Sequence, residues 1–388
     1  MPTMSGAFIL EPGAPGAGAR GWQGTLRGPG GYETELRLRL VDDPLTPPSV
    51  LDGLVGAMLP VVMRAGGSLH VRGSLTRSAL RNLTEFSEAW ANWQPGRFHR
   101  IRIEADRVVD GPSAQSGDEA LFAWSGSLRS THTLVRHLDG LVPGHFKVRA
   151  AVRVLGLRRA DDAVGDAAAL EGARLALAPD GVPLWAVRTN AAAAGLIDPE
   201  IGVLPIVGAA LHAFSTRCAV GLHARSWLFA AQLRFPRPGP VLQDLCSGDH
   251  FAVRADGGVN PPPQMAGALL PHPALAAAVS DCHRGPRHAP PCGRCPDCRL
   301  TALAFLAAGH SLPRRELRAG LAGVGTLRFN GPVRAADAEA TLEGWREGHR
   351  ALRGALAARV GLAAAVTDIR DHLRWFGAAA GLRPPWPR

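Results

Sequence analysis

The sequence predicts an α/β protein whose parallel β-sheet is covered by helices on both faces. Between residues 119 and 224, short apolar runs alternate with segments of helical length. Strands that are buried on both faces are apolar throughout, and parallel strands need crossover helices, so this alternation is typical of a parallel sheet. Hydrophobic residues make up 46% of the chain and charged residues 20%, which supplies a large core.

The first 112 residues are expected to form a small N-terminal α+β extension. About the first 30 are rich in Gly and Pro, which is typical of a loose arm. Beyond them, alternating polar and apolar residues predict strands, and amphipathic spacing predicts helices. The expected strands are 32–40, 68–73 and 98–105, and the expected helices are 49–66, bent or broken near Pro60, and 75–93. Residues 110–118 are expected to be a linker.

The parallel sheet is assigned to residues 118–310. Its expected strands are 119–124, 146–156, 182–190 and 217–224. The helices between them are expected to run from the Ser/Gly turn to about Leu138, over 161–178 and over 200–214. Residues 311–388 are expected to form a helical C-terminal region, with its main helix at 336–360.

The net charge of +10 comes almost entirely from arginine, because Lys147 is the only lysine. The arginines are scattered along the chain, so a solvated surface accounts for them without a nucleic-acid partner. The single lysine excludes a Gly-x-x-x-x-Gly-Lys phosphate loop, because Lys147 lies in an expected strand without the glycines.

The apolar runs exclude a membrane-spanning helix. The longest, such as residues 201–214, are shorter than the ~20 residues that cross a bilayer. The N-terminus lacks the basic leader and the long apolar segment of a signal peptide. A cytoplasmic protein without a membrane partner is therefore expected.

Four of the six cysteines share the spacing C-x9-C-x2-C-x2-C. They are Cys282, Cys292, Cys295 and Cys298. A tetrahedral zinc ion takes four soft ligands, and a C-x2-C turn aims two thiolates at one point. Gly293 would let that turn fold tightly. A zinc site with four cysteines has no open coordination position, so its role would be structural.

Other interpretations of the cysteines remain open. An iron–sulfur cluster uses the same ligands, and the thiols could also be unliganded. Disulfides are disfavoured in the cytosol. His283 or His288 could replace one ligand, although ordinary surface or buried histidines explain both. Cys218 and Cys246 stand alone in the sequence and are expected to be core residues.

A second candidate site lies in residues 121–134, LFAWSGSLRSTHTL. This stretch predicts a strand end, a Ser/Gly turn and a helix start. The N–H groups at a helix N-terminus carry partial positive charge and suit a phosphate. Gly126 would let the phosphate approach the main chain, and hydroxyl groups would come from Ser125, Ser127, Ser130 and Thr131. A serine-rich turn that only caps the helix is the alternative.

Together, the turn and the cysteines resemble the 7-cyano-7-deazaguanine synthases and their wider relatives, the PP-loop ATP pyrophosphatases. The resemblance covers roughly residues 118–310, and residues 1–112 look like the extension of many relatives. In the turn, the matching residues are Ser125, Gly126, Leu128, Ser130 and Thr131. In the zinc knuckle, they are Cys282, Cys292, Gly293, Cys295, Cys298 and Arg299.

This resemblance implies a Rossmann-like adenine-nucleotide α hydrolase fold with a five-stranded parallel sheet. It implies that ATP and Mg²⁺ bind, that AMP is transferred to a carboxylate or carbonyl oxygen, and that pyrophosphate leaves before a nitrogen or sulfur nucleophile displaces AMP. In the namesake reaction, ammonia converts 7-carboxy-7-deazaguanine to a nitrile by way of an amide. Relatives in antiviral defence operons are expected to join a deazaguanine acid to a protein amine. The implied partners are an adenine nucleotide, a deazapurine acid, and a protein partner or a second copy of the chain.

The turn departs from the family pattern Ser-Gly-Gly-x-Asp-Ser at two positions. Ser127 replaces a glycine beside the phosphate, and Arg129 replaces the aspartate. Arg129 can pair with a phosphate, but it cannot help to hold magnesium. Long relatives also carry a Gly-Ser-His-Pro turn before the knuckle, whereas residues 236–245 here keep only Asp244 from its polar side chains.

Three functions therefore stay open. The first is an ATP-dependent, AMP-forming ligase or amidating enzyme, with the turn around the phosphates, Arg129 in contact with them, and Asn190 as a further nucleotide or substrate contact. Outside that context, Asn190 is a turn residue. The second is a pseudoenzyme that binds a nucleotide or a partner protein. The third is a zinc-ribbon nucleic-acid binder, which the lack of an aromatic-basic cluster disfavours.

Overall fold

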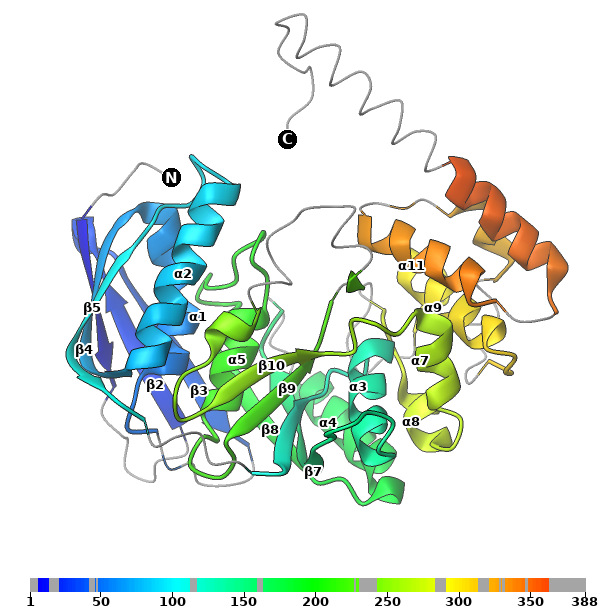
Figure 1. Cartoon of the computed structure of the whole chain (residues 1–388), viewed down its shortest axis with the longest axis horizontal. Coiled ribbons are helices and arrows are strands. Elements are labelled where there is room, and N and C mark those ends of the chain that lie inside the picture. The colour runs from blue at the N-terminus through cyan, green and yellow to red at the C-terminus, as the bar shows by residue number, and fades with distance from the viewer. Residues whose placement is uncertain are drawn as a thin grey trace, which may run out of the picture. The chain divides into compact units, whose positions relative to one another are not determined.

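The computed structural model forms two compact units, Met1–Gly258 with Pro271–Val279, and Val259–Leu270 with Ser280–Arg388 (Figure 1). It describes residues 6–13, 21–41, 46, 48–111, 117–158, 163–226, 228–229, 243–282, 291–312, 321–327, 329, 332–345 and 348–362. Within this part of the chain, no helix has the length and apolar character needed to cross a bilayer.

One mixed sheet of ten strands, most of them paired in parallel, runs through the first unit. Its order is β10-β9-β6-β7-β8-β3-β2-β1-β4-β5. The strands are β1 Gly6–Pro12, β2 Gly21–Arg27, β3 Glu33–Leu40, β4 Gly67–Thr76, β5 Arg102–Val109, β6 Glu119–Ala123, β7 Lys147–Leu155, β8 Leu184–Thr189, β9 Val220–Ala224 and β10 Ala252–Asp256. The prediction of an α/β protein is confirmed.

The helices of this unit connect and cover the strands. They are α1 Asp52–Ala65, α2 Arg77–Trp93, α3 Leu128–Leu138, α4 Ala163–Leu177, α5 Leu204–His212 and α8 Pro273–Ala278, with 3-10 turns η1 Pro29–Gly31, η2 Ala178–Asp180 and η3 Gln243–Cys246. Helix α1 continues through Pro60 without a break, because proline removes only one hydrogen bond of the ladder while ten other residues of the helix are buried. The break that was one of the two alternatives expected there is absent.

Five neighbouring strands, β10-β9-β6-β7-β8, are all parallel to one another. Numbered along the chain from β6, they have the order 3-2-1-4-5, so the direction of strand addition reverses between β6 and β9. Because parallel crossovers are right-handed, the α3 and α5 crossovers lie on opposite faces of the sheet. Both helices contact β6, β7 and β9, which explains why most residues of these strands are buried.

The N-terminal half continues the same sheet. Strand β3 pairs antiparallel with β8, through Leu38 with Thr189 and Leu40 with Val187, and β2 and β1 follow antiparallel. The expected strands and helices of residues 32–105 are present, but β1 and β2 form where a loose arm was expected. Leu10 and Leu26 are fully buried, and this burial outweighs the Gly and Pro content around them. The domain boundaries drawn from the sequence stay a prediction, and residues 112–116 of the linker lie outside the described residues.

The second unit contains α7 Pro262–Ala268, α9 Pro296–Ala307, the 3-10 turn η4 Leu321–Thr326, α11 Pro332–Glu343 and a helical segment 350–362. Helices α7, α9 and α11 pack on one another. The expected single helix 336–360 is divided, because Gly348 and His349 both have positive φ angles, 97° and 47°, that end a right-handed helix.

Candidate metal centre and phosphate-binding loop

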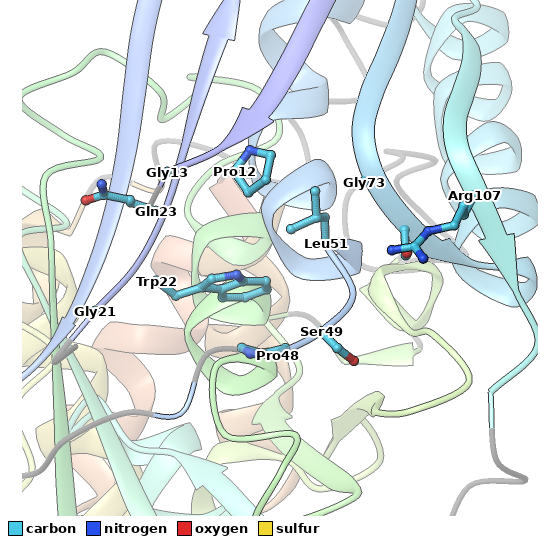
Figure 2. Close-up of a pocket in the computed structure, with 11 residues that line it drawn as sticks. Pro12, Gly13, Gly21, Trp22, Gln23, Pro48, Ser49, Leu51, Gly73 and Arg107 are labelled. Carbon is cyan, nitrogen blue, oxygen red and sulfur yellow. The ribbon is translucent and has the colours of Figure 1, made fainter. Parts of the chain in front are cut away.

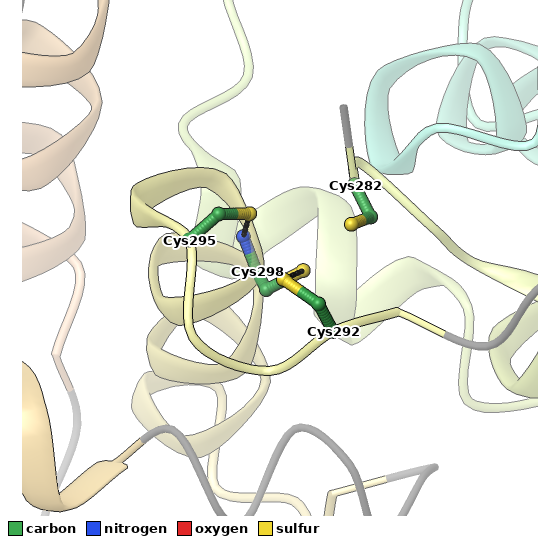
Figure 3. A group of neighbouring side chains, drawn as sticks. All are labelled: Cys282, Cys292, Cys295 and Cys298. Carbon is green, nitrogen blue, oxygen red and sulfur yellow. Dashed lines mark hydrogen bonds between the residues drawn. The ribbon is translucent and has the colours of Figure 1, made fainter. Parts of the chain in front are cut away.

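The four clustered cysteines converge in the second unit (Figure 3). We call Cys282, Cys292, Cys295 and Cys298 the cysteine cluster. All four sulfur atoms lie within 4.8 Å of one another, and the Sγ atoms of Cys292 and Cys298 are 4.0 Å apart. A tetrahedral zinc site with Zn–S bonds of 2.3 Å separates its sulfurs by about 3.8 Å. The cluster therefore has the ligands and the spacing to hold a metal ion such as zinc.

The local sequence explains this convergence. Gly293 has φ 67°, a left-handed conformation that glycine adopts without strain, and it turns the chain between Cys292 and Cys295. Cys295 is the N-cap of α9, and its Sγ accepts a hydrogen bond from the N–H of Cys298 at 3.4 Å. The helix start thus fixes two sulfurs side by side, and the preceding turn brings the third.

Cys282 comes from a separate segment, which α9 holds in place. The hydroxyl of Thr301 donates to Asp281 Oδ2 at 2.7 Å, directly beside Cys282. One turn earlier in α9, the Arg334 guanidinium of α11 donates two hydrogen bonds, of 2.7 and 2.8 Å, to the Asp297 carboxylate. These contacts preorganise the ligand segments before a metal ion enters.

The chemistry of the four thiols fits a metal ion. All six cysteines are free. Burial raises the pKa values of the Cys295 and Cys298 thiols, so both are protonated in the absence of a cation. A bound zinc ion would displace these protons and leave no open coordination position. His283 and His288 lie outside the described residues. Burial also raises the pKa of the Cys246 thiol, to about 12, and Cys218 is buried in the core.

The serine loop, residues 125–131, joins β6 to α3 in the first unit. Gly126 has φ 78°, and Ser127 is the N-cap of α3, where its Oγ accepts the N–H of Ser130 at 3.2 Å. The hydroxyl oxygens of Ser125, Ser127 and Ser130 form a triangle with sides of 3.0 to 3.1 Å. The loop thus gathers three hydroxyls at a helix N-terminus, where the helix dipole favours an anion.

The side chains of Arg153 and Trp124 hold the serine loop in place. Arg153 of β7 is buried, donates to the carbonyl of Ser125 at 2.8 Å, and lies over the ring of Trp124. The indole N–H of Trp124 donates to Thr131 Oγ1 at 3.2 Å. Thr131 is therefore engaged with the core, whereas Arg129 is half-buried in the first turn of α3. Sequence reasoning missed Arg153, although an arginine inside the apolar run 150–155 was a usable signal.

The loop lies at the carboxyl end of β6, where the order of the sheet reverses toward β9. In open α/β sheets, ligands bind in the crevice at such a reversal, because the flanking crossovers leave to opposite faces. Asn190 is not grouped with the serines. It follows β8, two strands away, and its amide bonds the backbone of β3: Oδ1 accepts from Arg37 N and Nδ2 donates to Glu35 O, each at 2.8 Å.

Other polar groups near this edge have structural contacts. Asp244 accepts the N–H of Ala255 at 2.9 Å and fastens η3 to β10, while residues 236–242 lie outside the described residues. His132, one turn into α3, is buried, and burial lowers its pKa to about 4. Comparison with known proteins gives no match: no family model, no curated protein and no solved structure corresponds to this chain.

Proposed function

We propose that this protein binds an adenine nucleotide at the serine loop and uses ATP to activate a carboxylate by adenylation. The observation that carries the proposal is the position of the loop, which caps α3 at the carboxyl end of β6 where the strand order reverses. This topology supports assignment of the five parallel strands to the Rossmann-like adenine-nucleotide α hydrolase class. The cysteine cluster supports the same relationship as a structural zinc knuckle.

The residues of the loop suit the charge that this reaction develops. A carboxylate oxygen attacks the α-phosphorus of ATP, the bond from that phosphorus to the bridging oxygen breaks, and pyrophosphate leaves. Negative charge grows on the phosphate oxygens, and hydroxyl donors at a helix N-terminus stabilise it. Ser125, Ser127 and Ser130 supply the hydroxyls, and Arg129 is the nearest cationic side chain in the sequence. A deazapurine acid is the carboxylate that the sequence resemblance suggests.

Magnesium would reach this site with the nucleotide phosphates. Within the described part of the chain, no carboxylate hydrogen-bonds to Ser125, Ser127 or Ser130. The position at which the family carries aspartate is Arg129. The loop itself therefore offers hydroxyl oxygens but no carboxylate to the ion, and an arginine supplies part of the positive charge instead.

A second candidate is a nucleotide-binding platform without turnover. Two features favour it: Arg129 stands where the family has its aspartate, and the three hydroxyls already satisfy one another. On this proposal the bound nucleotide stabilises the protein for a partner protein or a second copy of the chain, and no pyrophosphate is released.

Calorimetric titration with ATP, with and without Mg²⁺, tests both candidates alongside an assay for pyrophosphate release in the presence of a deazaguanine acid. Wild type is expected to bind ATP, and Ser130→Ala to bind it about 10-fold more weakly, because a hydrogen bond to a charged group contributes about 1.5 kcal/mol or more. The contribution of Arg129 to ATP binding is tested with Arg129→Ala. Arg81→Ala, which replaces an exposed arginine on α2, is its control.

Each outcome separates the candidates. Release of pyrophosphate by wild type supports adenylation, and binding without release supports the platform. The double variant Ser127→Gly, Arg129→Asp restores the family pattern at the loop. If neither wild type nor this variant binds ATP while both unfold at the same temperature, the proposed nucleotide site is wrong.

A further inference from the structure

A separate cavity lies in the N-terminal half of the first unit, away from the serine loop along the sheet (Figure 2). Its volume is about 280 Å³, just below the roughly 300–1,000 Å³ found for small-molecule sites. Four segments form its walls: the ends of β1 and β2, the residues before α1, the middle of β4, and β5. A ligand that fits this space is small, with one ring rather than several.

The walls of the cavity combine apolar and polar groups in similar proportion. Trp22 presents its indole among the lining side chains, and Leu51 stands beside it from the segment before α1. Both residues are 4% exposed, so their positions are fixed by core packing. Pro12 and Pro48 extend the same surface. The small exposed parts of these two side chains and the two prolines favour a flat ligand that packs against them.

A bulge in β4 opens the cavity toward β5. The register between β4 and β5 shifts between Val71 and Ser74, and Gly73 in the shifted part has φ 146°. A Cβ atom at Gly73 would come within 2.9 Å of Leu51 Cδ1, so glycine is what keeps this wall open. Beyond the bulge, Ser74 pairs directly with Arg107 of β5. Bulges of this kind re-aim side chains at the edge of a sheet.

Arg107 differs from the other arginines of this edge. Arg72 lies near Asp106, Arg77 pairs with Asp110, and Arg102 pairs with Glu104. Among the described residues, no acidic side chain pairs with Arg107, which lines the cavity together with Ser74 (Figure 2). A guanidinium donates two parallel hydrogen bonds to a carboxylate, and the hydroxyls of Ser49 and Ser74 can add to them.

We infer that this cavity is a binding site for a small planar carboxylic acid, whose ring lies against Trp22 and Leu51 and whose carboxylate pairs with Arg107. The apolar side chains of Trp22 and Leu51, together with the cationic side chain of Arg107, define this class. A neutral ring would leave Arg107 without a counter-charge, and an inorganic anion would leave the indole wall without a partner. The site is independent of the serine loop and does not need ATP.

Benzoate is the probe, with benzamide as its neutral isostere and cyclohexanecarboxylate as a non-planar acid. Saturation-transfer NMR and calorimetry on the full chain are expected to show millimolar binding of benzoate, and at least 10-fold weaker binding of the other two. Arg107→Gln should weaken benzoate about 10-fold, because it removes a charge-assisted pair, and leave benzamide unchanged. Arg102→Gln, on the same strand but paired with Glu104, is the matched control and should change neither.

Arg107 is exposed, so its replacement is not expected to unfold the protein, and the unfolding temperature of both variants checks this. A Gly73→Ala variant gives a second test, because its methyl group would close the wall at Leu51 and should abolish benzoate binding. Absence of benzoate binding at 10 mM, or equal binding by wild type and Arg107→Gln, would overturn the inference.

Discussion

The serine loop and the cysteine cluster use the same local device in two different units of the molecule. In each, a glycine with positive φ precedes a helix, Gly126 before α3 and Gly293 before α9. In each, the N-cap side chain accepts the N–H of the residue three positions on, at 3.2 Å for Ser127 and 3.4 Å for Cys295. The two sites therefore share the same backbone arrangement and differ only in the chemistry of their side chains.

That difference in chemistry decides how strongly each site specifies its ligand. Hydroxyl groups donate and accept, so the three serines satisfy one another without a ligand. Thiols are weak donors and weak acceptors, so four sulfurs within 4.8 Å gain little from one another. The cysteine cluster is therefore a stable arrangement mainly with a cation at its centre, whereas the serine loop is stable with or without an anion.

The largest expected effect is loss of the metal from the cysteine cluster. Purified protein should contain one zinc ion per chain, measured by elemental analysis, and Cys298→Ser should lose it. Structural zinc binding contributes on the order of 10 kcal/mol in small zinc domains, so a chelator should lower the free energy of unfolding of the second unit by several kcal/mol. This result would sharpen the contrast between the two sites, because removing a ligand from the serine loop is not expected to lower the free energy of unfolding by several kcal/mol.

Cys218→Ser is the matched control for the metal. Its thiol donates to backbone carbonyls at 3.4 Å, which a hydroxyl can also do, and it lies in the first unit. Zinc content should be unchanged in this variant. A Cys298→Ser protein with a full equivalent of zinc would contradict the assignment of the ligands.

The two sites were predictable from sequence to different degrees for the same reason. The C-x2-C spacing carries its geometry locally, so the convergence of Cys292, Cys295 and Cys298 followed from the spacing, and Cys282 joins them from a separate segment. The serine loop depends on its place in the sheet, which rests on pairings between distant residues such as Leu38 with Thr189. Those pairings also account for the missed strands β1 and β2 and for Asn190, whose amide bonds β3 from 153 residues away in the sequence.

The next effect in size is a dependence of stability on acid pH that arises beside the serine loop. Burial, with Arg136 and Arg129 nearby, lowers the pKa of His132 to about 4, although Asp256 opposes the shift and His137 also faces it. A folded pKa below the unfolded value of 6.5 means that stability is complete above pH 6.5 and falls as the pH drops toward 4. The loss is on the order of 3 kcal/mol. Chemical denaturation between pH 4 and 7 should show a smaller fall for His132→Gln than for wild type.

At the other end of α3, His272 should make stability depend on pH in the opposite direction, and it serves as the internal control. His272 hydrogen-bonds Asp180 at 2.6 Å and Asp139, the C-cap of α3, at 3.0 Å. Burial would lower its pKa, but these two carboxylates outweigh burial and raise it. Its contribution is therefore complete below pH 6.5 and is lost as the pH rises through the raised pKa. His272→Gln should reduce the dependence of the free energy of unfolding on pH only above pH 6.5. A change below pH 6.5 would show that the effects of the two histidines are not separable.

The smallest effect compares the two turn glycines directly. An alanine at positive φ costs about 1–2 kcal/mol, so Gly126→Ala and Gly293→Ala should each lower the free energy of unfolding by about this amount. Gly172→Ala, in α4 with nothing within 4 Å of the added methyl group, should instead stabilise the protein by about 0.5–1 kcal/mol. Only Gly293→Ala should also weaken zinc binding, measured by competition with a chelator. Equal zinc affinity for Gly293→Ala and wild type would mean that the cysteines reach the ion without the glycine turn. The two sites would then share a backbone conformation that has no role in binding at the cysteine cluster.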